Sequence, residues 1–127
     1  YEIQDTFYGV MDETKCAYLI SLAQGCPVCA RLIVAWITYH TCDKANTCNV
    51  DFVSVLPTMC GWVKTAAEAH PLLLDTCLGA AKAVLSAAQS ILQAGEHEDV
   101  AKVSLLTEQV TVAQRAGMEL CVQLIVA

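Results

Sequence analysis

The residues best suited to chemistry in this sequence are eight cysteines: Cys16, Cys26, Cys29, Cys42, Cys48, Cys60, Cys77 and Cys121. Two of them form a C-x-x-C motif, CPVC, in which Pro27 fits the first turn of a helix. A helix N-terminus lowers the pKa of a thiol, and the thiolate is the nucleophile of thiol–disulfide exchange. In redox enzymes this motif usually belongs to a βαβ unit, whereas the preceding segment, KCAYLISLAQG, has a helical pattern. We therefore expect structural disulfides here rather than redox catalysis.

Zinc binding is a second chemistry that these side chains could support, because Cys26, Cys29, His40, Cys42 and Cys48 supply enough ligands. However, no second C-x-x-C and no H-x₃-H follows, and the residues between the ligands have the pattern of a hydrophobic helix. The sequence therefore predicts no metal site and no cofactor.

Catalytic motifs are missing from the sequence. It contains no glycine-rich phosphate loop, no H-E-x-x-H and no G-x-S-x-G. His40, His70 and His97 are isolated from one another, and each is better explained as a surface or helix-end residue than as a general base. We therefore predict that the protein is not an enzyme.

An even number of cysteines in a chain of 127 residues favours four disulfides and an oxidising compartment. Secretion fits this pattern, and a signal peptide removed before Tyr1 would fit it too. Cys29 and Cys60, and likewise Cys42 and Cys48, lie at similar distances on either side of Ala45. In an antiparallel hairpin centred there, each pair would be level. We therefore predict the disulfides Cys29–Cys60 and Cys42–Cys48.

The remaining four cysteines are harder to pair. Cys16 and Cys26 would lie about 15 Å apart along one helix, which is too far for a disulfide. Each should therefore bridge to the C-terminal hairpin, unless Cys77 pairs with Cys121 across it. That choice stays open.

The elements that must position these side chains are helices. The pattern predicts helices over residues 12–24, 27–41, 51–69 with a kink or restart at 56–57, 71–94 and 99–125. Pro27, Pro57 and Pro71 each fit a first helical turn, and Gly25 and Gly95 fit helix ends. The predicted fold is all-α, a five-helix disulfide-stapled bundle of antiparallel hairpins. We expect one domain over 1–127, with 1–11 an extended acidic arm.

The last two predicted helices carry the clearest apolar periodicity, in steps of three and four. The two stripes are Leu74, Leu78, Ala81, Leu85, Ala88 and Leu92, and Val103, Leu106, Val110, Ala113, Gly117, Leu120 and Leu124. Joined by the short turn GEHED, they predict an antiparallel hairpin in which the small residues allow close approach. Val100, Leu105 and Val112 lie off the second stripe, so this helix has more apolar surface than one neighbour can cover.

Charge is scarce, and this bears on partners. Charged residues make up 16% of the chain and apolar residues 56%, against roughly 25% charged in a typical soluble domain. With a net charge of −6 and no cluster of Lys or Arg, nucleic acid is not an expected partner. A transmembrane anchor over 16–42 is not expected either, because Gln24, Gly25, Pro27 and Arg31 interrupt it.

Two functions would use the apolar surplus. The first is carriage of an apolar small molecule or lipid in a cavity between the helices, with Leu105, Val112 and Ile125 on the wide apolar face and Trp36 and Trp62 as aromatic walls. The alternative is an extracellular structural component, toxin or effector whose apolar surface is covered by self-association or by a partner protein. The sequence slightly favours carriage.

Overall fold

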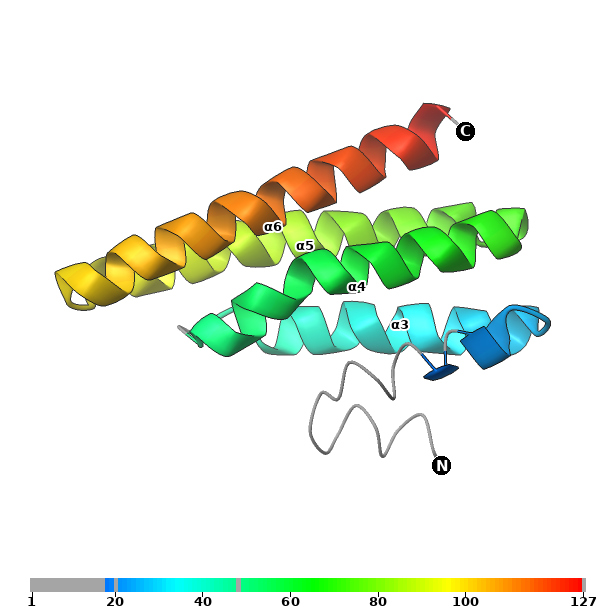
Figure 1. Ribbon diagram of the computed structural model, residues 1–127, viewed down its shortest axis with the longest axis horizontal. Coiled ribbons are helices and arrows are strands. Elements are labelled where there is room, and N and C mark those ends of the chain that lie inside the picture. The colour runs from blue at the N-terminus through cyan, green and yellow to red at the C-terminus, as the bar shows by residue number, and fades with distance from the viewer. Residues whose placement is uncertain (1–17, 20, 48, 127) are drawn as a thin grey trace.

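The computed structural model describes residues 18–19, 21–47 and 49–126. Over these residues it is all-α and contains no strand, which confirms that the fold is all-α as predicted. The long helices are α3 (Pro27–Asp43), α4 (Val50–Ala69), α5 (Leu74–Ala94) and α6 (Val100–Val126) (Figure 1). Two short 3₁₀ helices, η1 (Pro71–Leu73) and η2 (Gly95–His97), flank α5.

Several predicted features lie wholly or partly outside the described residues. These are the arm over 1–11, Cys16, Cys48 and the beginning of the predicted helix over 12–24. The described part of that helix, 18–19 and 21–23, is helical, and a turn at 24–25 separates it from α3. The position of Gly25 as a helix stop therefore agrees with the structure.

Helix boundaries follow from capping side chains. The Asn49 Oδ1 atom accepts hydrogen bonds from the backbone N–H groups of Asp51 (2.9 Å) and Phe52 (3.2 Å) at the start of α4. The Asp99 Oδ1 atom accepts one from the N–H of Lys102 (2.9 Å) at the start of α6. Because such caps are local, the predicted helix ends at 27–41, 51–69, 71–94 and 99–125 agree closely with the observed ones.

Pro57 differs from the prediction for the other prolines. Pro27 and Pro71 begin helices, but Pro57 lies inside α4, which continues on both sides of it. Proline has no N–H to bond the carbonyl of Val53, so a helix that contains it is expected to bend. Figure 1 shows the first turns of α4 at an angle to the rest. The predicted kink is therefore present, and the predicted restart is not.

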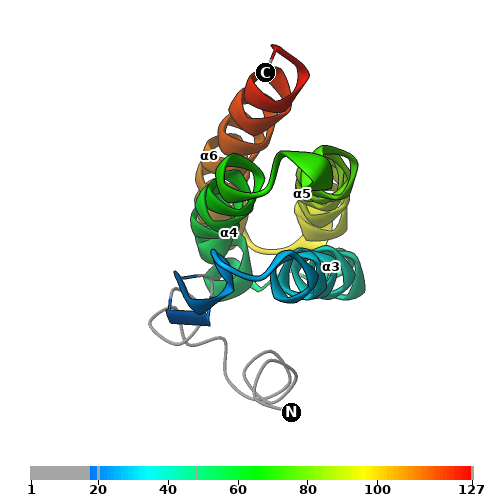
Figure 2. The same cartoon turned by 90° about the vertical axis from the view of Figure 1, so that its right-hand side faces the viewer.

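α5 is the helix against which the others pack. It contacts α3, α4 and α6, and α6 also packs against α4, whereas α3 and α4 contact each other much less. Viewed along the helices, α3 and α5 lie on one side and α4 and α6 on the other (Figure 2). The predicted hairpin of residues 27–41 with 51–69 is therefore not a closely packed pair, although these helices are consecutive.

Mostly small residues form the buried face of α5, which consists of Cys77, Ala80, Ala81, Val84, Ala87, Ala88 and Ile91. The leucines of the predicted stripe, Leu74, Leu78, Leu85 and Leu92, are only half-buried at its edges. On α6 the predicted stripe is buried from Leu106 to Leu124, and Val103 is half-buried. Because α5 packs against three helices, its buried face is wider than that of a helix that packs against only one.

The segment Pro71–His97 has the length and hydropathy of a membrane-spanning helix, the one such segment among the described residues. Its most apolar face is packed in the core, where Cys77, Ala81, Ala88 and Ile91 are at most 1% exposed. Lys82, Gln89 and Gln93 are exposed on its other side. The core contacts thus use part of its apolar surface, and 39% of its most apolar window is buried.

At Gly117, α6 lies close to α5. A Cβ atom there would lie 3.0 Å from Leu85 Cδ2 and 3.4 Å from Val84 Cγ1. Gly117→Leu should therefore overpack this contact and lower the free energy of unfolding by about 1–3 kcal/mol, measured by urea denaturation. Gly79→Leu is the matched control, because a Cβ atom at this exposed position of α5 meets nothing within 4 Å. Equal effects at the two sites would contradict the packing assigned to Gly117.

Candidate functional site

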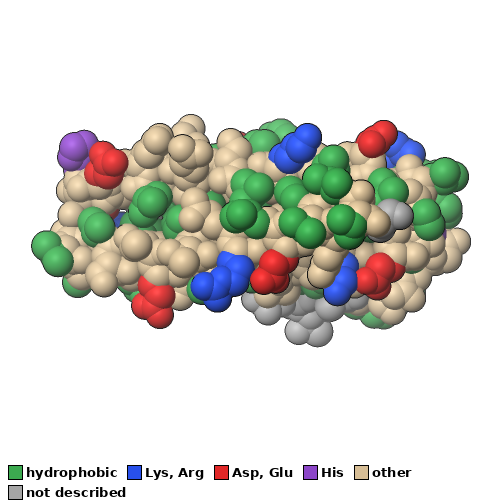
Figure 3. Space-filling model, turned by 90° about the horizontal axis from the view of Figure 1, so that it is seen from above, with side chains coloured by type: hydrophobic (Ala, Val, Ile, Leu, Met, Phe, Trp, Pro, Cys, Tyr) green, Lys and Arg blue, Asp and Glu red, His purple; other side chains and the backbone are tan. Residues whose placement is uncertain are grey.

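The outer face of α6 is the most prominent apolar surface of the described chain. Of the exposed large hydrophobic side chains, seven lie on this helix: Val100, Leu105, Val112, Met118, Val122, Ile125 and Val126. The C-terminal end of α6 rises away from α4 and α5 (Figures 1 and 2). Viewed from above, hydrophobic side chains follow most of the length of this side of the molecule (Figure 3). Exposed apolar surface of this kind typically marks an interaction site.

A regular stripe runs along this face. Six exposed residues follow one another in steps of four and three, namely Glu108, Val112, Arg115, Glu119, Val122 and Val126. Such spacing places side chains on one line along a helix, here opposite the buried stripe. We call these six residues the outer seam. Val112 stands out in the sequence, but the seam does not, because two carboxylates and one guanidinium interrupt its apolar pattern.

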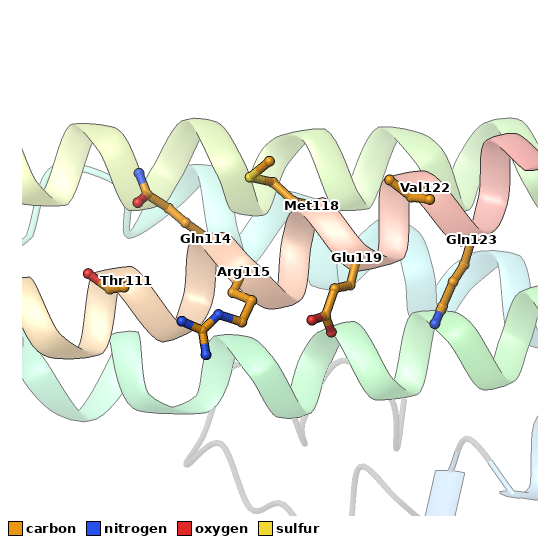
Figure 4. Close-up of a pocket in the computed structure, with 7 residues that line it drawn as sticks. All are labelled: Thr111, Gln114, Arg115, Met118, Glu119, Val122 and Gln123. Atoms are coloured by element: carbon orange, nitrogen blue, oxygen red, sulfur yellow. The ribbon is translucent and has the colours of Figure 1, made fainter.

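An open groove of about 620 Å³ covers the C-terminal half of the seam. Its walls are all on α6, formed by Thr111, Gln114, Arg115, Met118, Glu119, Val122 and Gln123. In Figure 4, Gln114, Met118 and Val122 point toward the α5 side. Arg115, Glu119 and Gln123 point toward the α4 side. The groove thus has a largely apolar margin and a charged margin.

The five predicted ligand-binding residues do not come together in this groove. Leu105, Val112 and Ile125 are 44%, 46% and 70% exposed on α6. Trp62 is buried in the core, and Trp36 is half-buried on α3, with its ring edge-on to Tyr39 at a centroid distance of 5.6 Å. The structure therefore places three of the five on the outside of α6 and two in or beside the core.

A second groove, of about 350 Å³, lies between helices. Ala67, Leu74 and Leu124 give it apolar walls from α4, α5 and α6, and Gln123 completes the α6 side. Lys64 and Glu68 line it from α4, and their charged atoms lie 3.9 Å apart. This groove opens where the end of α6 separates from α4 and α5.

A further apolar stripe lies on α3. Val28, Leu32, Ala35 and Tyr39 are all exposed and follow one another in steps of four, three and four. The opposite face of α3 carries the buried residues Ala30, Ile33, Val34, Ile37 and Thr41. α3 is therefore apolar on two sides, of which only one faces the core.

The described cysteines are free thiols: Cys26, Cys29, Cys42, Cys60, Cys77 and Cys121. The predicted Cys29–Cys60 bridge is not formed, because α3 packs against α5 rather than along α4. The Cys29 sulfur lies 2.9 Å from the Cys26 sulfur instead. Cys42 is exposed, and its predicted partner Cys48 lies outside the described residues. The structure shows no bridge from Cys26 or Cys77 to the C-terminal helix.

Differences in burial and hydrogen bonding give the thiols different pKa values. Desolvation raises the pKa of Cys77 to about 11, and desolvation together with the nearby Cys121 raises the pKa of Cys60 to about 11. At the start of α3, the pKa values of Cys26 and Cys29 shift in opposite directions. The hydrogen bond between the two thiols, followed by that from the Cys29 backbone N–H, lowers the pKa of Cys26, and the contact between the thiols raises the pKa of Cys29.

The histidines occupy separate positions. His40 is half-buried against the ring of Phe52 at a centroid distance of 5.7 Å, and burial lowers its pKa, with a further contribution from Lys44. His70 ends α4, and its Nε2 atom lies 3.0 Å from the carbonyl oxygen of Ala23. His97 is exposed in η2. Within the described ranges, no three His, Cys, Asp or Glu side chains gather as metal ligands.

Comparison with protein-family models, with curated proteins and with solved structures found no match to this chain.

The pKa differences predict an order of thiol alkylation in the fully reduced protein. At a pH of about 8, a thiol with a pKa of about 11 is ionised on the order of one part in a thousand. Iodoacetamide should therefore label exposed Cys42 well before Cys60 and Cys77, as read by peptide mass spectrometry. In urea the order should disappear. Early labelling of Cys77 in the folded protein would contradict its burial.

Proposed function

We propose that the protein is a secreted, non-catalytic binding protein that self-associates through the outer seam of α6. The single observation that carries the proposal is the row of exposed residues from Glu108 to Val126, in which three valines and three charged groups follow one another at heptad spacing. Exposed valines in a regular row gain free energy when another surface removes them from water. The core is already filled by the opposite face of α6, so this surface is available to a partner.

The charges of the seam favour a second copy of the chain as that partner. In an antiparallel pair of α6 helices centred near Gly117, Arg115 of one copy would lie level with Glu119 of the other. The same register would bring Val112 level with Val122. In a dimer with a two-fold axis each contact occurs twice, so the interface would contain two Arg115–Glu119 ion pairs and two Val112–Val122 pairs. A parallel pair would instead place like charges together.

The extent of the seam limits the affinity. Six residues on one helix cover less than the roughly 800 Å² per partner of a standard stable interface. Met118 and Ile125 beside the seam add apolar area, and both are exposed. We therefore expect a dimer whose population depends on protein concentration.

A second candidate function is carriage of an apolar small molecule, and the groove between α4, α5 and α6 favours it. Its volume of about 350 Å³ lies within the range of roughly 300–1,000 Å³ that is typical of ligand pockets. Its walls of Ala67, Leu74 and Leu124 suit an acyl or terpenoid chain, and Lys64 at its margin suits a carboxylate.

Charge reversal tests the self-association. Arg115→Glu should weaken dimerisation by at least about tenfold, because it would bring like charges together twice in the dimer. Glu119→Arg should do the same, and the double variant Arg115→Glu/Glu119→Arg should restore dimerisation. The readout is the mass of the particle by analytical ultracentrifugation across a concentration series. Both residues are exposed, so the fold should be unaffected.

Two outcomes would contradict the self-association. One is a wild-type monomer at every concentration, and the other is a double variant that remains as weak as the single ones. Native mass spectrometry of protein from its natural source then decides the second candidate. A monomer with bound organic mass would support carriage, and a ligand-free monomer would contradict both functions.

We also propose that the secreted protein contains disulfides, as predicted, since they would stabilise an extracellular dimer. Cys60 on α4 and Cys121 on α6 belong to two helices that pack against each other, and Cys121 contributes to the raised pKa of Cys60, so we propose Cys60–Cys121 in place of Cys29–Cys60. If all eight cysteines are oxidised in pairs, the intact mass of the natural protein should be lower by eight hydrogens than that of the reduced protein. Free thiols at Cys60 and Cys121 after secretion would contradict this bridge.

A further inference from the structure

The C-x-x-C motif forms a compact two-sulfur site at the N-terminus of α3. Cys26 is the N-cap residue, and its sulfur accepts a hydrogen bond from the backbone N–H of Cys29 at 3.4 Å. The two sulfurs are 2.9 Å apart. Pro27 occupies the first helical turn, where its fixed φ favours the helix. Two thiols in contact, rather than a single capping thiol, define the site.

Tertiary contacts hold the turn that presents Cys26. The carbonyl oxygen of Ala23 accepts the backbone N–H of Cys26 at 2.9 Å, and His70 Nε2 lies 3.0 Å from the same oxygen. His70 comes from the end of α4, so a second helix fixes the turn before α3. The Cys26 carbonyl then accepts the N–H of Ala30 at 3.0 Å, which begins the helix. The position of Cys26 is therefore set from both sides.

The two thiols differ in ways that suit different roles. The sulfur of Cys26 shares a hydrogen bond with the Cys29 thiol and accepts one from the Cys29 backbone N–H, and these contacts lower the pKa of Cys26. Cys29 lies within the helix, and its pKa is raised by the contact between the thiols. A thiolate is the attacking species in exchange, and a neighbouring thiol resolves the mixed disulfide. Cys26 is thus suited to attack and Cys29 to resolve.

The site is also accessible. Both cysteines are partly exposed, and Val28 between them is 76% exposed. Leu32, one turn further along α3, is 47% exposed. A disulfide-bearing molecule can approach the sulfurs without opening the core, and an apolar one would find side chains beside them.

We propose that Cys26 and Cys29 are a reversible dithiol/disulfide site that exchanges with accessible disulfides. The Cys26 thiolate attacks one sulfur of a disulfide R–S–S–R′, so that a bond from Cys26 to R–S forms and R′–S⁻ leaves and takes up a proton. Cys29, after losing its proton to solvent, attacks the Cys26 sulfur, forms the Cys26–Cys29 bond and releases R–S⁻. The protein loses two electrons and two protons, and the disulfide becomes two thiols. This chemistry goes beyond the binding proposed above and does not depend on it.

The test follows the reaction of the reduced full-length protein with oxidised glutathione, sampled by acid quench and peptide mass spectrometry. In the wild type, a Cys26–Cys29 disulfide should form and should be reopened by millimolar reduced glutathione. Cys29→Ser should stop at a glutathione adduct on Cys26, since the resolving thiol is missing. Cys26→Ser should slow adduct formation in residues 26–29 by about tenfold or more. Serine is a good N-cap, so this variant should keep α3, as checked by circular dichroism.

Cys42→Ser is the matched control, because it removes an exposed thiol of α3 that has no described neighbouring sulfur, and it should leave the Cys26–Cys29 reaction unchanged. A disulfide-bonded peptide with apolar flanking residues forms the second arm. Faster exchange with the peptide identifies a protein disulfide as the substrate, and faster exchange with glutathione identifies a small one. The proposal is overturned if Cys26 reacts no faster than Cys42. It is equally overturned if the Cys26–Cys29 bond resists reduced glutathione, since that bond would be purely structural.

Discussion

The packing of α3, α4 and α6 against the small-residue face of α5 is the constraint on which the rest of the structure depends. Alanines at 80, 81, 87 and 88 leave room for neighbouring backbones, and Gly117 lets α6 approach Leu85 and Val84. Since three helices share one central helix, each turns a single face inward. The residues on the outside of α3 and α6 are then determined by the sequences of these helices, and on both helices they include a row of exposed apolar side chains.

This arrangement connects composition with function. A chain with 16% charged residues cannot cover its surface with charge, and the structure shows that the apolar excess lies largely on the outside rather than around an enclosed cavity in the described part of the chain. The exposed side chains are not scattered, because the outer seam of α6 and the stripe on α3 both follow helical spacing. Regular stripes favour helix-to-helix association over irregular contacts, and the alternating charges of the seam favour an antiparallel partner.

The cysteines show that helix packing decides which residues of a sequence pattern come into contact. Cys29 and Cys60 are level only if residues 27–41 and 51–69 form a close hairpin, and the packing on α5 separates those helices. Cys29 thereby remains beside Cys26, where the helix start and the contact of His70 with Ala23 hold the two sulfurs together. The thiols of buried Cys60 and Cys77 are less reactive by comparison, since desolvation opposes their ionisation.

Local interactions made the helices predictable from the sequence alone. Caps at Asn49 and Asp99, prolines at 27 and 71 and the stripe from Leu106 to Leu124 act within a few turns of one chain, so the all-α class, the helix ends and the buried face of α6 could be predicted. Tertiary structure decided which helices are neighbours, which cysteines meet and which apolar residues stay outside. Those outcomes depend on the simultaneous packing of three helices on α5. The spacing of residues in the sequence cannot predict these outcomes, because two cysteines that would be level in a hairpin lie apart when their helices pack against other helices.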